Sequence, residues 1–136
     1  MLAAAAEAAA NFTTPPQLLA VTVLTSMDRF QLESTGILKT AAQHALLLAK
    51  MAAANGIHGF VCSPEEATNL RNALPGATLV TPGIRPIGSA TGDQRRIATP
   101  SAAIAAGADY LVVGRPITQA GNPAVAARAL LEEMSV

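Results

Sequence analysis

Arginine side chains are concentrated in the loop that follows Pro82-Gly83. Arg85 is its first arginine, Gln94 lies further along it, and a later apolar run ends at Gly114-Arg115. Guanidinium groups bind phosphate oxygens in pairs, a glycine lets backbone N–H groups approach the same anion, and an amide adds a neutral donor. These residue types predict a phosphate site built from Arg85, Gln94, Gly114 and Arg115.

Simpler interpretations of these residues remain open. Arg85 and Arg115 can be ordinary surface arginines, and Arg95 and Arg96 are expected to be solvated or paired with Asp93. The stretch GIRPIGSATG lacks the lysine and the spacing of a nucleotide-binding P-loop. Two guanidinium groups that approach each other repel unless an anion lies between them, which favours the phosphate interpretation.

Other polar residues follow the remaining apolar runs. Thr25 and Ser26 are expected either to contact a ligand or to bond to backbone at a strand end. Cys62 is expected to be a small buried residue and not a nucleophile, because no histidine partner is evident. His44 lies within a helical segment and His58 at the start of a strand, so neither is a good catalytic base.

Apolar runs alternate with helical segments along the chain. Buried strands are predicted at 18–23, 57–63, 77–82 and 109–114, and residues 24–36 are predicted to form a polar loop in which Asp28 caps the loop or the segment after it. Helices are predicted in the alanine-rich start, at 37–56, after the capping box Ser63-Pro64-Glu65-Glu66, from Thr99-Pro100 to Gly107, and after Asn122-Pro123.

The predicted strands are continuous apolar runs, which is typical of parallel strands buried on both faces. Four βα units of this kind form either a small open sheet or part of a (β/α)₈ barrel, an α/β fold. In both cases the strand-to-helix loops lie at one edge, where ligands bind. Adjacent strands lie about 4.8 Å apart, so Arg85 and Arg115 can approach a common point if the third and fourth strands are neighbours.

Length and composition narrow the class of protein. The 136 residues fit a single domain, here 1–136, with nine basic and nine acidic residues and 51% hydrophobic residues. This balance favours no nucleic-acid partner, and no apolar stretch is long enough to predict a membrane span. A single cysteine fits a reducing compartment such as the cytoplasm.

Four stretches of the sequence resemble the carboxyl-terminal half of bacterial orotidine 5′-phosphate decarboxylases: AVTVLTSMD, GFVCSPEEA, LVTPGIRPIGSATGDQRRIATP and DYLVVGRPITQAGNPA. The resemblance runs from about Leu18 to the last helix. It implies a TIM barrel, present here as about four βα units, from a cytoplasmic homodimeric lyase of pyrimidine biosynthesis. Such enzymes convert orotidine monophosphate to UMP and CO₂ without a cofactor or metal.

The resemblance also implies roles for individual residues. Arg85, Gln94, Gly114 and Arg115 would bind the 5′-phosphate. Thr25 would lie near the pyrimidine, with Ser26 and Pro82 as further pyrimidine contacts.

The sequence departs from that family in its charged residues. The family's catalytic lysines and aspartates, including an Asp-x-Lys-x-x-Asp stretch, lie in its amino-terminal half. This chain contains only Lys39 and Lys50, which are expected on the solvated face of one helix, and no Asp-x-Lys motif. We therefore expect no catalytic residue in this chain.

Three interpretations are consistent with this departure. The chain is a truncated decarboxylase, a non-catalytic phosphate-binding half-barrel that needs a complementary half, or a relative that acts on a sugar phosphate. The strands at its two ends are expected to leave open edges that promote self-association.

Overall fold

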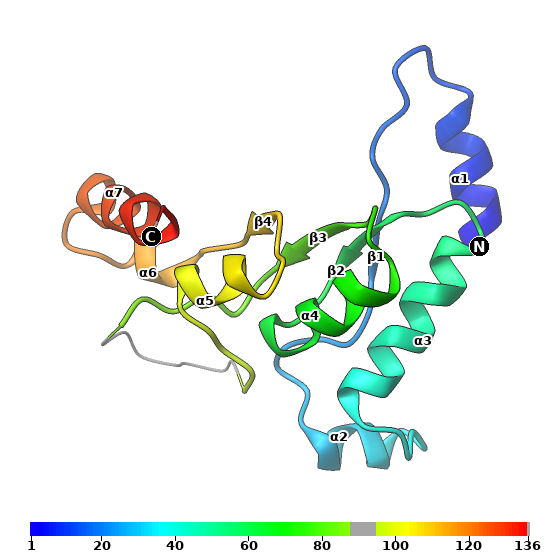
Figure 1. Cartoon of the computed structure of the whole chain (residues 1–136), viewed down its shortest axis with the longest axis horizontal. Helices are drawn as coiled ribbons and strands as arrows, with labels where there is room; N and C mark the ends of the chain where they lie inside the picture. The colour runs from blue at the N-terminus through cyan, green and yellow to red at the C-terminus, as the bar shows by residue number, and fades with distance from the viewer. Residues whose placement is uncertain (88–94, 136) are drawn as a thin grey trace.

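A four-stranded parallel sheet forms the centre of the computed structural model, which describes residues 1–87 and 95–135 (Figure 1). The strands are β1 (Leu19–Val21), β2 (Gly59–Val61), β3 (Thr78–Thr81) and β4 (Tyr110–Leu111). They lie in chain order, β1-β2-β3-β4, and every pair is parallel. The predicted α/β architecture with a parallel sheet is confirmed, although each strand is shorter than predicted.

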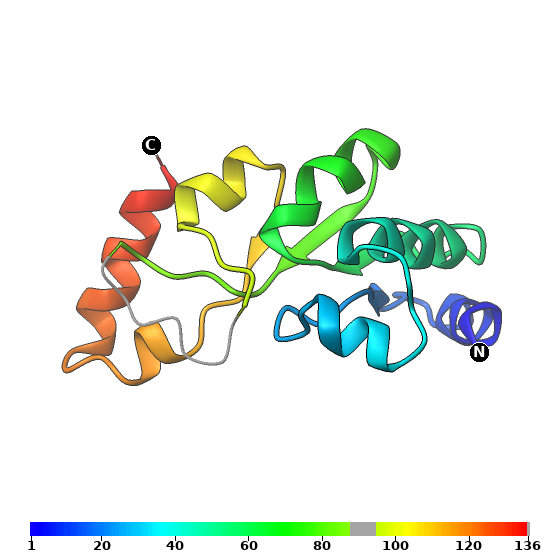
Figure 2. The same ribbon diagram turned by 90° about the horizontal axis from the view of Figure 1, so that it is seen from below.

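Seven helices are found in the described residues, and they connect or flank the strands. They are α1 (Leu2–Ala10), α2 (Arg29–Ser34), α3 (Ala41–Ala53), α4 (Pro64–Ala73), α5 (Pro100–Ala105), α6 (Arg115–Thr118) and α7 (Pro123–Met134). Helices α1 and α7 lie at opposite ends of the molecule's long axis (Figures 1 and 2). None of the described helices is long and apolar enough to cross a membrane.

Local capping residues set the helix starts. Ser63 caps α4 in the predicted capping box, and the Thr99 and Asn122 side chains accept hydrogen bonds from the first turns of α5 and α7. The prediction of one helix over 37–56 is wrong at its start. Thr40 and Gln43 form a capping box, so α3 begins only at Ala41. Gly56 is in the left-handed region, as expected of the residue that ends this segment.

The predicted loop at 24–36 contains a short helix, α2. Asp28 caps it in a capping box with Gln31, which confirms the capping role expected of Asp28. Leu32 of this helix packs with Val23 and Ala45 in a small buried cluster. That apolar contact anchors α2 to the end of β1 and to α3.

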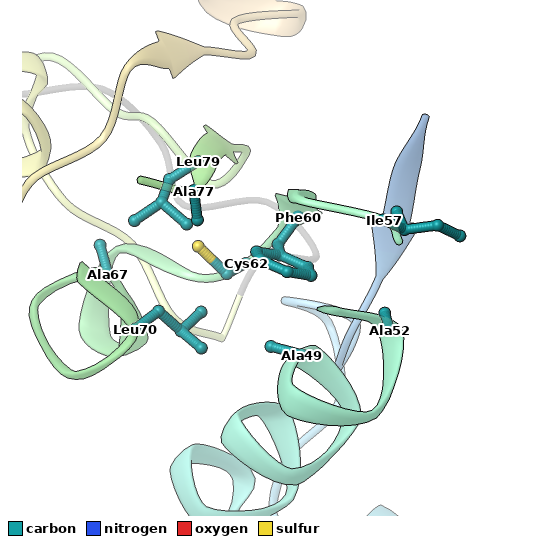
Figure 3. Close-up of a cluster of buried hydrophobic side chains, with 9 residues drawn as sticks. All are labelled: Ala49, Ala52, Ile57, Phe60, Cys62, Ala67, Leu70, Ala77 and Leu79. Atoms are coloured by element: carbon teal, nitrogen blue, oxygen red, sulfur yellow. The ribbon is translucent and has the colours of Figure 1, made fainter. Parts of the chain in front are cut away.

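The main hydrophobic core lies between one face of the sheet and helices α3 and α4. Figure 3 shows the nine buried side chains of this cluster. Phe60 of β2 and Leu79 of β3 project from the sheet, and Ala49, Ala67 and Leu70 from the helices pack against them. Alanine lets α3 and α4 approach the strands closely, which explains why an aliphatic, aromatic-poor chain can form a well-packed core.

The opposite face of the sheet remains partly exposed. We call it the open face; its residues are Leu19, Val21, Thr78, Val80, Tyr110 and Val112. Leu19 is 45% exposed and Tyr110 is 60% exposed. A shallow groove between them is lined by Gln17, Thr78 and Val80. The prediction that the strands are buried on both faces is therefore wrong for β1 and β4, because helices α3, α4 and α5 pack against the other face.

One arginine fastens the amino-terminal ends of β3 and β4. Arg71 donates hydrogen bonds to the carbonyls of Ala77 (2.7 Å) and Gly107 (2.8 Å) and to the carboxylate of Asp109 (2.7 Å). Asp109 also accepts from the Leu79 backbone N–H at 2.7 Å. Partial burial alone would raise the pKa of Asp109, but the hydrogen bonds from Leu79 and Arg71 and the Arg71 charge lower it below its usual value.

Candidate functional site

The two ends of the arginine-rich loop are joined by backbone hydrogen bonds. We call residues 82–98 the arginine loop; the structure describes its first limb, 82–87, and its return limb, 95–98. The Arg85 N–H donates to the Ala98 carbonyl at 2.9 Å, and the Ala98 N–H donates to the Gly83 carbonyl at 3.3 Å. Gly83 has φ of 84°, which explains why a glycine follows Pro82 in the loop. Gln94, predicted as a phosphate ligand, lies outside the described residues.

The two predicted phosphate arginines follow neighbouring strands. Strands β3 and β4 pair in register, with Thr81 opposite Leu111, so the first limb and the Gly114-Arg115 segment leave the same edge of the sheet. Arg85 is buried, and its guanidinium donates to the Ile84 carbonyl at 2.7 Å. Arg115 is exposed as the first residue of α6. The strand adjacency that the phosphate prediction requires is present.

Gly114 immediately precedes α6 at this edge. No atom of the described chain other than its immediate neighbours would lie within 4 Å of a Cβ added to Gly114. The backbone there is accessible from the side on which a side chain would project. This space beside Gly114 is compatible with the close approach of an anion that the sequence predicts there.

The structure brings the predicted pyrimidine residue Thr25 to the return limb. Its backbone carbonyl accepts a hydrogen bond from the Arg95 N–H at 3.3 Å, and its side chain is buried. Ser26 beside it is partly buried, as is Pro82 at the start of the arginine loop. The exit of β1 and the arginine loop are thus part of one cluster.

Arg96 corrects the expectation that this arginine is solvated. Its side chain is only 9% exposed and forms an ion pair with Glu66, which is 2% exposed. The guanidinium also donates to the carbonyls of Val23 (3.2 Å) and Leu24 (2.8 Å). Burial lowers the pKa of Arg96. Arg95, in contrast, is exposed as predicted, and Asp93 lies outside the described residues.

Glu66 is a residue whose role the sequence did not reveal beyond its capping box. Its Oε2 accepts from the Ser63 N–H at 3.0 Å, which completes the cap of α4, while Oε1 faces Arg96. One carboxylate therefore joins the start of α4 to the return limb. A glutamate three residues after a capping serine is an ordinary helix-start pattern, so nothing local indicates the distant arginine.

Cys62 is a buried residue at the end of β2, as predicted. Its sulfur lies 3.9 Å from the Thr81 hydroxyl. Burial raises the pKa of the Cys62 thiol, although the Thr81 hydroxyl opposes that shift. A thiol held in its neutral form is a poor nucleophile, which agrees with a packing role.

The two lysines lie at the molecular surface. Lys39 and Lys50 are both exposed and line the same shallow groove beside α3, together with Gln43, Leu46 and Leu47. Their predicted solvent exposure is confirmed. Lys39 precedes the helix and its Thr40 cap, so the prediction that both lysines lie within one helix is wrong.

Comparison with known proteins identifies related sequences across the whole chain. Residues 1–130 match the model of the orotidine 5′-phosphate decarboxylase / HUMPS family. The orotidine 5′-phosphate decarboxylase of Idiomarina loihiensis is 53% identical over 132 residues, which are 96% of this chain and 57% of that protein. That of Chromobacterium violaceum is 51% identical over an alignment of 137 positions, which covers 100% of this chain and 56% of that protein.

Solved structures show the same relationship. The crystal structure of the Lactobacillus acidophilus orotidine 5′-phosphate decarboxylase superposes with a TM-score of 0.81 at 35% identity, covering 100% of this chain and 58% of that chain. The Pyrococcus horikoshii enzyme has a TM-score of 0.63 at 25% identity. The chain thus spans somewhat more than half the length of the relatives that it matches.

Proposed function

Because the chain belongs to the orotidine 5′-phosphate decarboxylase / HUMPS family, we propose that it forms the nucleotide-binding part of an enzyme that converts orotidine monophosphate to UMP and CO₂. The observation that carries this proposal is the hydrogen bond between Thr25 and Arg95, because it joins the β1 exit to the arginine loop. A nucleotide has a phosphate at one end and a base at the other. In this proposal the arginines at this edge of the sheet bind the phosphate, and Thr25 contacts the base.

In this proposal Arg85 and Arg115 bind the 5′-phosphate, and the Gly114 backbone and Gln94 add hydrogen bonds to it. The pairing of β3 with β4 supports the placement of the two arginines at one edge. Thr25, with Ser26 and Pro82 beside it, contacts the pyrimidine. The same proposal includes a cytoplasmic location, which the presence of a single, buried cysteine supports.

The chemical step needs a proton donor, and neither of the two lysines in the sequence lies at the proposed binding edge. Decarboxylation breaks the bond between C6 and the carboxylate carbon, releases CO₂ and leaves an electron pair at C6 that must accept a proton. An ammonium group is a suitable proton donor, but Lys39, before α3, and Lys50, within α3, are both exposed at the surface. We propose that the lysine and aspartates come from a complementary half-barrel.

The open face supports a proposal of self-association. Leu19, Val21, Tyr110 and Val112 are exposed apolar side chains on or next to the two outer strands. Outer strands with unpaired backbone and apolar surface tend to pair with other chains. In the absence of a complementary half, a second copy of this chain is the proposed partner.

The alternative function is non-catalytic phosphate binding by this chain alone. An assay of orotidine monophosphate turnover separates the two candidates, using purified chain with and without the separately expressed amino-terminal half of the Idiomarina loihiensis relative. We expect turnover only in the mixture, and less of it when the chain carries Arg115→Ala. The carboxyl-terminal half of that relative is the matched control. Turnover by the isolated chain, or none in a mixture in which the control pair is active, contradicts the proposal.

A further inference from the structure

The buried Glu66–Arg96 pair is separate from the residues proposed to touch the nucleotide. We infer that this pair is a positioning device that holds the return limb of the arginine loop against the exit of β1, and so fixes Arg85 relative to Thr25. The inference rests on the proposed function for the identity of the ligand. Neither Glu66 nor Arg96 is proposed to contact it.

Arg95 and Arg96 donate hydrogen bonds to three successive carbonyls that follow β1. The Arg96 guanidinium donates to Val23 and Leu24, and the Arg95 N–H donates to Thr25. A planar guanidinium presents several donors in a fixed fork, so it can hold two neighbouring carbonyls and a carboxylate at once. The β1 exit is therefore held to the return limb along its length and not at a single point.

Glu66 keeps Arg96 in that position. Both side chains are almost fully buried, and a buried charge without its partner is strongly unfavourable. Movement of the guanidinium toward a ligand would leave the Glu66 carboxylate unpaired beside the start of α4. The Arg96 side chain is thereby held in the protein interior, whereas Arg95 beside it is exposed.

The return limb also determines the position of Arg85, because backbone hydrogen bonds join the two limbs of the loop. Ala98 lies two residues after Arg96. Its backbone N–H donates a hydrogen bond to Gly83 of the first limb, and its carbonyl accepts one from the Arg85 N–H. Displacement of the return limb would therefore displace Arg85 as well. The pair thus sets the distance between the proposed phosphate and pyrimidine contacts without touching either part of the ligand.

Amide hydrogen exchange tests this positioning directly in the complete chain. We expect exchange at Arg85, Arg95 and Ala98 to rise about tenfold or more in Arg96→Lys and in the double variant Glu66→Gln/Arg96→Met. The double variant removes both charges together, so no lone buried charge prevents folding. Exchange at Cys62 and Thr78, whose amides bond within the sheet, should stay unchanged. Arg95→Met is the matched control and should leave the pattern intact.

The inference is wrong if exchange at Arg85, Arg95 and Ala98 is unchanged in the two variants. It is also wrong if exchange rises equally at all amides, because the pair would then stabilise the whole fold and not the position of the loop. UMP titration by calorimetry forms the second arm. We expect the UMP dissociation constant to rise about tenfold in both variants, and unchanged affinity despite faster loop exchange also overturns the inference. If the wild-type chain binds neither UMP nor inorganic phosphate, the proposed function fails, while the exchange arm still decides whether the pair positions the loop.

Discussion

The carbonyl oxygen of Thr25 accepts a hydrogen bond from the backbone N–H of Arg95, although the two positions are 70 residues apart in the sequence. Only backbone atoms make this contact, so the Arg95 side chain is left exposed at the surface. The arginines at this edge of the sheet therefore have different roles. Arg95 contributes its backbone, Arg96 its buried guanidinium, and the proposed phosphate contacts come from Arg85 and Arg115.

Replacement of Arg115 should weaken UMP binding more than replacement of Arg95. We expect Arg115→Ala to raise the UMP dissociation constant roughly ten- to a hundredfold, because it removes a charged hydrogen-bond partner of the phosphate. Arg95→Ala keeps the N–H that bonds Thr25 and should change affinity by less than about twofold. Calorimetric titration measures both, with inorganic phosphate as competitor. Equal effects, or equally tight binding of uridine, would place the phosphate elsewhere.

A methyl group at Gly114 should interfere with the ligand and not with the protein. The described chain leaves space for a Cβ there, so we expect Gly114→Ala to fold normally but to bind UMP roughly tenfold more weakly, the equivalent of one hydrogen bond to a charged group. Gly121→Ala is the matched control, since a Cβ there also meets no described atom within 4 Å. Unaltered affinity in Gly114→Ala would show that the phosphate does not approach this backbone.

Asp109 should make stability depend on pH in the acidic range. Its pKa is lower in the folded chain than the usual value of about 3.9. Its contribution is therefore complete above the unfolded pKa and is lost as the pH falls through the folded pKa. We expect Asp109→Asn to cost about 1 kcal/mol or less at pH 7, because the Arg71 pair is partly exposed, and to cost progressively less below about pH 4.

Thermal or urea unfolding from pH 7 to pH 2.5 measures this difference. The control is Glu33→Gln, which removes a carboxylate from the exposed pair with Arg29. A cost for Asp109→Asn that stays constant across that range would contradict the assignment of the Asp109 carboxylate as a stabilising partner of Arg71 and Leu79.

A charge on the open face should reduce self-association. We expect the wild-type chain to sediment above its monomer mass at micromolar concentration, and Val21→Lys or Tyr110→Lys to shift it toward the monomer, because a lysine on an outer strand opposes pairing. Leu38→Lys replaces a side chain that is also exposed and apolar but lies outside the sheet, and it should have no effect. A wild-type monomer, or an equal shift with Leu38→Lys, would rule out the open face as the contact.

Local patterns predicted the helix starts that depend on neighbouring residues. Ser63 with Glu66, Thr99 with Pro100, and Asn122 with Pro123 each cap the helix that the sequence predicts. The start of α3 was missed because the apolar residues Ile37 and Leu38 extend the helical pattern before the Thr40 capping box.

Features that depend on residues distant in the sequence could not be predicted from local patterns. The sequence of an apolar strand such as β1 is the same whether its second face is covered or open. The exposure of Leu19 and Val21 could therefore not be predicted from the neighbouring residues. The sequence predicts that Arg96 is either solvated or paired with Asp93, because only nearby residues can be considered as partners. The partner found in the described residues, Glu66, belongs to another βα unit, and only the tertiary structure brings Glu66 and Arg96 together.

The hydrogen bond from Arg96 to Val23 also bears on the order of folding. Each strand pairs with the strand before it in the chain, so the sheet can grow one unit at a time. Arg96 and Val23, however, are 73 residues apart, and closing a longer stretch of chain costs more entropy. We expect this contact to form only after the intervening strands have shortened the effective path. The hydrophobic core would then be complete before the proposed binding edge is, and a late folding intermediate would be compact but would not yet have the proposed nucleotide site.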